Sequence, residues 1–367
     1  MSLYIAIYAY LLLLALACSF CLTIVARRCA LRWGVLDQPG ERKMHHAPIP
    51  VMGGAAIFGA FALVAGLNAA LLVLLPLEEW GLGWLSREIL AFLQPDAGLK
   101  LAGLITGAVI ITGLGAVDDI WMLGPWTKLA GQVAAASILV ACGMQVNLFI
   151  PYPAVTALIT VLWVVTMVNA MNFLDNMDGL AGGVSVIAAL SFFLCVAPQG
   201  DLFLSVLLMI FAGAAAGFLW HNLHPARIFM GDTGSMFCGY FLATAPILAT
   251  FYTPGSPSRV AVAAPLLALS VPIFDIVSVV YIRWRNGESI MKGDKRHFSH
   301  RLVELGMSPR QAVEFIFLVA AICGLGAALL PQIAVSGTLI ILAQTTGIFL
   351  LIVLLMNANN RSADPNP

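Results

Sequence analysis

The chain has 367 residues, of which 61% are hydrophobic and only 10% are charged. Soluble domains carry about 25% charged residues, so this composition excludes an ordinary soluble protein and indicates one that spans a membrane. The formal net charge is zero, which excludes the overall positive field that attracts nucleic acid.

Apolar segments of about 20 residues recur along the chain, and each is long enough to cross the hydrocarbon core of a bilayer as a helix. Short polar loops separate them, with no internal repeat and no composition shift that would suggest a second domain. The predicted fold is therefore one all-α polytopic membrane domain over residues 1–367. Its eleven predicted spans are 3–25, 51–76, 99–117, 127–146, 153–172, 179–197, 202–220, 234–252, 260–282, 311–330 and 335–356.

With eleven spans, the loops alternate between two sides of the membrane, and fifteen of the 18 Lys and Arg residues fall on one side. Because basic residues accumulate in cytoplasmic loops, that side is predicted to be cytoplasmic, with the N-terminus outside and the C-terminus inside. The predicted cytoplasmic segments are the loops 26–50, 118–127, 169–178, 221–233 and 283–310 and a disordered tail, 357–367.

The first two cytoplasmic stretches contain candidate ligands for phosphate and metal. Lys43 lies in the segment Leu36–Pro50, which either covers a site or forms a surface linker. Asp118 and Asp119 end the third span, where acidic side chains oppose the helix dipole, so a solvated helix end gains nothing from them. Carboxylates instead suit Mg²⁺ or Mn²⁺, which can hold a phosphate oxygen. Lys128 either contacts a phosphate or extends to the membrane surface.

The third stretch carries four polar residues at a spacing of three, namely Asn169, Asn172, Asp175 and Asp178. Neighbours in such a series share one face of a helix. Four side chains in phase are more than a polar helix cap needs. A binding surface for substrate is therefore favoured over a cap.

The fourth stretch, with the sequence FMGDTGS at 229–235, is the most specific. Gly231 and Gly234 leave room for backbone amides to approach an anion, and Asp232 between them can bind a metal. Asn222 lies ten residues upstream of Asp232, across the same loop. A simple turn is the alternative interpretation.

The fifth stretch, Arg283–Arg301, contains His297, His300 and Arg301. A positive loop that binds anionic lipid explains its Lys and Arg residues but not its two histidines, so phosphate contact is predicted. Asp275 lies inside the ninth predicted span. It is either a functional acid or the partner of a nearby Arg, and it is left outside the predicted site.

Six stretches together resemble the polyprenyl-phosphate N-acetylhexosamine-1-phosphate transferases, and the resemblance runs from about Val35 to Arg310. They are VLDQPGERKMHHAPIPVMGG, GAVDDIWMLGPWTKLAGQ, NAMNFLDNMDGLAGG, WHNLHPARIFMGDTGS, VPIFDIV and DKRHFSHRL. The resemblance implies an enzyme of the plasma (bacterial inner) membrane whose active site faces the cytoplasm. Such an enzyme transfers an N-acetylhexosamine 1-phosphate, here GlcNAc-1-phosphate, from a UDP-amino sugar to polyprenyl (undecaprenyl) phosphate with Mg²⁺. The reaction releases UMP and initiates a cell-envelope glycan.

The resemblance also implies roles for individual residues. The catalytic residues would be Asp118, Asp119, His297 and His300, and the metal ligands Asp232, Asp118 and Asp119. The substrate-binding residues would be Lys43, Lys128, Asn172, Asp175, Asp178, Asn222, Gly231 and Arg301. Relatives commonly have HxHH where this chain has His297-Phe298-Ser299-His300. The triple-histidine signature of the phospho-MurNAc-pentapeptide transferases is absent, which argues against that substrate. Relatives form dimers, so a homodimer is also expected.

Three alternatives remain at this point. The donor could be another UDP-amino sugar or the phospho-MurNAc-pentapeptide nucleotide, with the same chemistry. A phosphatase acting on lipid diphosphates would instead release inorganic phosphate. A transporter is the most distant alternative, because transport sites lie near the bilayer midplane in repeated, broken helices, whereas these acids gather at one interface.

Overall fold

A computed structural model describes residues 2–38, 47–76, 78, 79, 81, 83, 95–146, 150–249, 259–289 and 296–362. Most of the described residues are helical. The α-helices are α1 (Ser2–Trp33), α2 (Gly53–Leu74), α4 (Pro95–Trp121), α5 (Pro125–Ala141), α6 (Pro153–Leu174), α7 (Leu180–Val196), α8 (Leu202–Asn222), α9 (Gly231–Leu248), α10 (Ala264–Ala268), α11 (Ser270–Arg285), α12 (Phe298–Glu304), α13 (Pro309–Leu329) and α14 (Val335–Ser362). Three short 3-10 helices are η1 (Ala197–Gln199), η2 (Arg259–Ala263) and η3 (Leu330–Gln332).

The starts of several helices follow from the local sequence. Pro125, Pro153 and Pro309 each occupy the first turn of a helix, where the missing N–H costs no hydrogen bond. Ser308 and Gln311 form a capping box at the start of α13. Helix α14 continues to Ser362, so the residues directly after 356 are helical where a disordered tail was expected.

Each of the eleven predicted spans coincides with a helix or a broken helix. Eight described helices are long and apolar enough to cross a membrane, or nine if one bent pair counts as a span. Helices α5 and α9 do not meet that test by themselves. The ninth predicted span, 260–282, corresponds to a bent pair of helices, because Val260–Ala268 and Ser270–Arg285 meet at 73°. Pro272 explains the break, since its ring clashes with the carbonyl of Ala268, four residues earlier.

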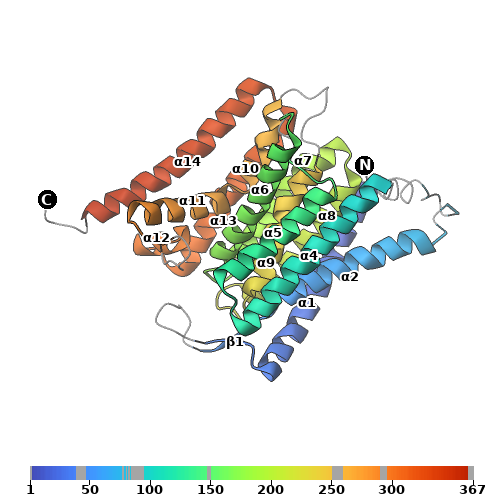
Figure 1. Ribbon diagram of the computed structural model, residues 1–367, viewed down its shortest axis with the longest axis horizontal. Helices are drawn as coiled ribbons and strands as arrows, with labels where there is room; N and C mark the ends of the chain where they lie inside the picture. Colours follow the sequence, from blue (N-terminus) through green and yellow to red (C-terminus); the bar gives the residue numbers. More distant parts are fainter. Residues whose placement is uncertain are drawn as a thin grey trace.

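The core of the bundle is formed by α6, α7, α8 and α9, with α4 beside α9 and α13 beside α7. Every residue of α9 from Thr233 to Ala245 is buried. This helix therefore faces protein and not lipid, which allows it to be less apolar than its neighbours. In the apolar stretch of α8, 78% of the residues are buried, compared with 11% in α14. Figure 1 shows α14 along one side of the bundle, away from α1 and α2.

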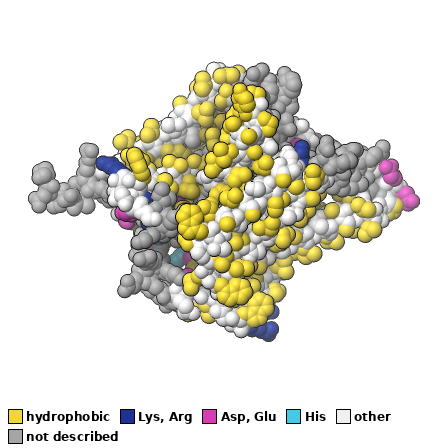
Figure 2. All heavy atoms as spheres, in the orientation of Figure 1, with side chains coloured by type: hydrophobic (Ala, Val, Ile, Leu, Met, Phe, Trp, Pro, Cys, Tyr) yellow, Lys and Arg dark blue, Asp and Glu magenta, His cyan; other side chains and the backbone are white. Residues whose placement is uncertain are grey.

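The outer surface has the pattern of a protein in a bilayer. Exposed large hydrophobic side chains are spread along α1, α2, α4, α6 and α14. In Figure 2, apolar side chains cover the helices on the visible face, and the charged side chains gather toward its margins. Several exposed tryptophans lie close to helix ends, including Trp33, Trp121, Trp220 and Trp284. Such rings favour the interface between lipid and water.

A small ribbon fixes the connection between α1 and α2 at the start of α9. Strands β1 (Leu36–Asp37) and β2 (Ile49–Pro50) pair antiparallel. The next residue, Val51, forms a parallel bridge with Phe229. The backbone amide of Gly54 then donates to the carbonyl of Met230, at 2.8 Å. These contacts place the beginning of α2 directly against the FMGDTGS segment.

Candidate active site

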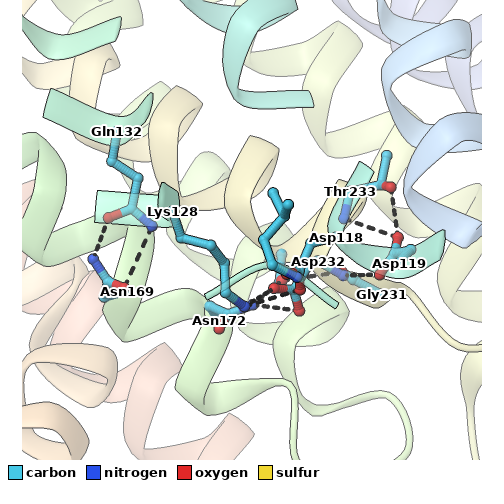
Figure 3. A network of polar contacts seen from close by, with 11 residues as sticks. Asp118, Asp119, Lys128, Gln132, Asn169, Asn172, Gly231, Asp232 and Thr233 are labelled. Carbon is cyan, nitrogen blue, oxygen red and sulfur yellow. Dashed lines mark hydrogen bonds and ion pairs between the residues drawn. The ribbon is translucent and has the colours of Figure 1, made fainter. Parts of the chain in front are cut away.

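A lysine between two carboxylates forms the centre of the candidate site (Figure 3). The Nζ atom of Lys128 lies 2.6 Å from Oδ2 of Asp232 and 2.9 Å from Oδ2 of Asp118. On its other oxygen, Asp232 accepts a hydrogen bond from Nδ2 of Asn172, at 2.9 Å. The same amide group contacts Oγ of Ser235, also at 2.9 Å. Four residues predicted from the sequence are thus in one connected network.

Four helices that are distant in the sequence supply this network. Asp118 is near the end of α4, Lys128 near the start of α5, Asn172 near the end of α6, and Asp232 at the start of α9. The two carboxylates are 114 residues apart, yet they share one ammonium group. All four residues therefore lie at the same end of the helix bundle. That end carries the predicted cytoplasmic stretches.

Two further aspartates of the third stretch lie beside this network. The pKa of Asp175 is raised to about 8, first because its carboxyl is removed from water, and second because Asp232 and Asp119 carry like charges nearby. Asp178 accepts hydrogen bonds from Nδ1 of His224, at 2.8 Å, and from the backbone amide of Ala226. The region concentrates negative charge, and a cation bound there would balance it.

The histidine stretch packs against the end of α6. The His297 ring contacts the Phe173 ring edge to face, with centroids 5.7 Å apart. Ser299 is buried and donates to Oδ1 of Asn176 at 2.5 Å. The ring centroids of His300 and His297 are 6.4 Å apart. The fifth stretch therefore lies beside the third, as a shared site requires.

Arg301 was predicted to bind phosphate, but its described contacts are with other side chains of the protein. The Arg301 guanidinium donates to Oγ of Ser278 at 2.5 Å and lies over the Phe274 ring, 5.8 Å from its centroid. Its predicted phosphate contact stays a prediction. Lys43 lies outside the described residues. Within the described ranges, no group of three or more His, Cys, Asp or Glu side chains is arranged to hold a metal ion.

Comparison with known proteins identifies the family of the chain. The profile of glycosyl transferase family 4 matches residues 101–250. A probable undecaprenyl-phosphate N-acetylglucosaminyl 1-phosphate transferase from Bacillus subtilis (strain 168) is 32% identical over 345 residues, which cover 90% of this chain and 86% of the relative. The chain belongs to glycosyl transferase family 4.

Two other relatives support the same family. A decaprenyl-phosphate N-acetylglucosaminephosphotransferase from Mycobacterium tuberculosis (strain ATCC 25618 / H37Rv) is 37% identical over 336 residues, covering 82% of this chain and 77% of the relative. An undecaprenyl-phosphate alpha-N-acetylglucosaminyl 1-phosphate transferase from Yersinia pestis is 25% identical over 328 residues, covering 85% and 80%. As a member of glycosyl transferase family 4, the protein is a multi-pass membrane transferase.

Asp119 stabilises the start of α9 in this family 4 transferase. Its Oδ1 accepts from the backbone amide of Asp232, at 2.7 Å. Its Oδ2 accepts from the backbone amide of Thr233, at 3.1 Å, and from the Thr233 hydroxyl, at 2.6 Å. Gly231 has φ +71°, and a Cβ there would lie 2.6 Å from Oδ2 of Asp119. A glycine is therefore required beside this carboxylate. The predicted roles of Asp119 in metal binding and catalysis stay predictions.

Asp119→Asn is expected to lower the thermal stability of the protein. The amide has one acceptor oxygen in place of two, so at least one hydrogen bond to the first turn of α9 is lost. A hydrogen bond to a charged group contributes about 1.5–3 kcal/mol. The midpoint of thermal unfolding in detergent should fall further than in Thr233→Val, which loses only the hydroxyl contact. An unchanged midpoint would show that Asp119 does not hold α9.

Two amide side chains, those of Asn222 and Gln132, have contacts that the sequence did not predict. Asn222 is buried, accepts from the backbone amide of Gly179 at 3.0 Å and donates to the carbonyl of Ile228 at 2.9 Å. It therefore ties the α6–α7 connection to the α8–α9 loop, and its predicted contact with substrate stays a prediction. Gln132 was overlooked and pairs with Asn169, at 2.6 Å. Its position four residues after Lys128, on the same helix face, was the available signal.

Proposed function

We propose that the protein transfers GlcNAc-1-phosphate from UDP-GlcNAc to polyprenyl phosphate, with Mg²⁺, and releases UMP. The observation that carries this proposal is the Asp118–Lys128–Asp232 contact, built from helices far apart in the sequence. The names of three relatives, which are N-acetylglucosaminyl 1-phosphate or N-acetylglucosamine phosphotransferases of polyprenyl phosphates, support the same transferred group and the same class of acceptor. The product would be a polyprenyl diphospho-sugar that begins a cell-envelope glycan.

The donor atoms at the centre of the site fit a magnesium ion. One oxygen of Asp118 and one of Asp232 both lie within 3 Å of the same Nζ atom, so they converge on one point. Magnesium in enzymes of phosphate chemistry is usually held by one or two carboxylates, together with waters and substrate phosphates. Mn²⁺ has similar ligand preferences.

The reaction brings two anions together, so charge balance and positioning are the main tasks of the protein. An oxygen of the lipid phosphate attacks the β-phosphorus of the UDP-sugar, and the bond from that phosphorus to the bridging oxygen breaks, leaving UMP. Phosphomonoesters have a second pKa of about 6, so the lipid phosphate needs no strong base at neutral pH. Lys128 and His297 would balance charge on the phosphates. Bound Mg²⁺ would supply further positive charge at the diphosphate.

The proposed topology has eleven crossings, with the N-terminus outside and the C-terminus in the cytoplasm. The burial of α9 supports counting it as a crossing, because protein and not lipid surrounds it. The acids and the histidine stretch would then face the cytoplasm, where nucleotide sugars are available. The membrane would be the plasma membrane, and a homodimer is proposed from the relatives.

Purified full-length protein in lipid nanodiscs tests the proposed function directly. With undecaprenyl phosphate and Mg²⁺, UDP-GlcNAc should yield UMP and a lipid product whose mass has increased by one GlcNAc-phosphate. UDP-GalNAc and other UDP-amino sugars in parallel identify the donor. Release of inorganic phosphate without a sugar-lipid product would indicate a phosphatase. Uptake of solute into liposomes without any product would indicate a transporter.

A further inference from the structure

A fully buried carboxylate lies in the middle of the broken ninth span. Asp275 is in α11 and has no exposed surface. Its Oδ2 lies 2.8 Å from Nδ1 of His297, and its Oδ1 accepts from the backbone amide of Phe298 at 2.5 Å. Burying a carboxyl group is costly unless it forms hydrogen bonds. Its two oxygens contact two consecutive residues, His297 and Phe298, and these contacts fix the beginning of α12.

The contact with Asp275 determines which nitrogen of His297 carries a proton. A carboxylate accepts hydrogen bonds and cannot donate them, so an ionised Asp275 requires a proton on Nδ1 of His297. The other nitrogen, Nε2, is then left for a second partner. The imidazole is only 7% exposed, so packing also limits its rotation. A histidine ligand in a metal site is oriented by a carboxylate in the same way.

The position of His297 connects it to the candidate active site. Its ring packs on Phe173, which directly follows Asn172 in α6, and Asn172 contacts Asp232. The Ser299–Asn176 contact holds α12 to the same end of α6. We propose that Asp275 is a positioning residue, which fixes the ring orientation of His297 and holds a proton on Nδ1, so that Nε2, when protonated, donates a hydrogen bond to a substrate phosphate. This inference rests on the proposed function for the identity of that phosphate.

The geometry predicts a specific effect of Asp275→Asn. The backbone amide of Phe298 can only donate, so the carbonyl oxygen of the new amide must face it. The NH₂ group of the amide must then face Nδ1 of His297 and donate to it. This removes the proton from Nδ1 and leaves the neutral Nε2–H tautomer, without the positive charge that would face the phosphate. The side-chain volume is nearly unchanged, and the contact to Phe298 remains.

Two measurements on the full-length protein in lipid bilayers test the proposal. Nitrogen-15 NMR of histidine-labelled protein reports the protonation of each ring nitrogen, and His297→Asn identifies the His297 signals among those of the six histidines. We expect protonated Nδ1 in the wild type and unprotonated Nδ1 in Asp275→Asn. We also expect kcat to fall by about 10- to 100-fold in Asp275→Asn with little change in KM, a typical effect of losing an orienting partner.

A double-mutant cycle separates positioning from general support of the fold. If Asp275 acts through His297, Asp275→Asn should have no further effect on kcat in the His297→Asn background. A purely structural role would lower kcat again in that background. Additive effects, or a wild-type spectrum with unprotonated Nδ1, would overturn the proposal. If Asp275→Asn does not accumulate, the wild-type spectrum alone still tests whether Nδ1 of His297 is protonated. A wild type that forms no sugar lipid would reject the proposed function, whereas the NMR comparison would still test the tautomer.

Discussion

Asp232→Asn is expected to lower kcat by at least about 100-fold, the usual scale for removing one charge-stabilising group from an active site. The substitution keeps the size of the side chain, and its carbonyl oxygen can still accept from Asn172. It removes the negative charge that faces Lys128, at 2.6 Å, and that would hold the metal. The protein should therefore fold and insert but lose turnover. Initial rates of UMP release at saturating substrates measure the effect.

Asp201→Asn is a matched control for this experiment. Asp201 caps the N-terminus of α8 by accepting from the backbone amide of Leu204, at 3.0 Å, and asparagine also caps helices well. It lies at the opposite end of α8 from Asn222, about 30 Å away along a helix of 21 residues. Its kcat should equal that of the wild type. Near-wild-type turnover in Asp232→Asn would contradict the proposed mechanism.

The sequence was a good guide to the helices and to the end of the bundle where the site lies. Each apolar segment became a helix because its length and composition leave few other structures in a bilayer. The polar motifs could be assigned to one side of the membrane because each pair of spans forms a helical hairpin, which returns the chain to the side that it left. That reasoning predicts that Asp118, Lys128, Asn172 and Asp232 lie together at one end of the bundle. It could not determine which atoms would touch.

The parts that could not be predicted depend on packing between distant segments. The role of Asp119 at α9 depends on how closely the end of α4 approaches Gly231. Asp275 could not be matched with His297, because the residues are 22 positions apart and belong to different elements, α11 and the start of α12. The bend itself had a signal in Pro272. That signal was missed because the apolar composition of the segment continues on both sides of the proline.

Removal of the metal is expected to abolish activity, and added Mg²⁺ to restore it. Without a divalent cation, the diphosphate would meet the concentrated negative charge of Asp118 and Asp232. Treatment with EDTA, followed by dialysis and a Mg²⁺ titration, gives the metal concentration at half-maximal activity. Full activity in EDTA would remove the metal from the proposed mechanism. Mn²⁺ is expected to substitute, because it accepts the same oxygen ligands.

The same titration in two variants distinguishes the neighbouring aspartates. Asp118 directs one oxygen toward the point shared with Asp232, whereas both oxygens of Asp119 are bonded to the first turn of α9. Asp118→Asn should therefore need much more Mg²⁺ for half-maximal activity, and Asp119→Asn should change that concentration less while lowering thermal stability. Equal shifts in both variants would mean that Asp119 leaves its contacts with α9 and binds the metal during turnover. The two aspartates are adjacent in the sequence, so this difference would come from the packing of α4 against α9 and not from the motif.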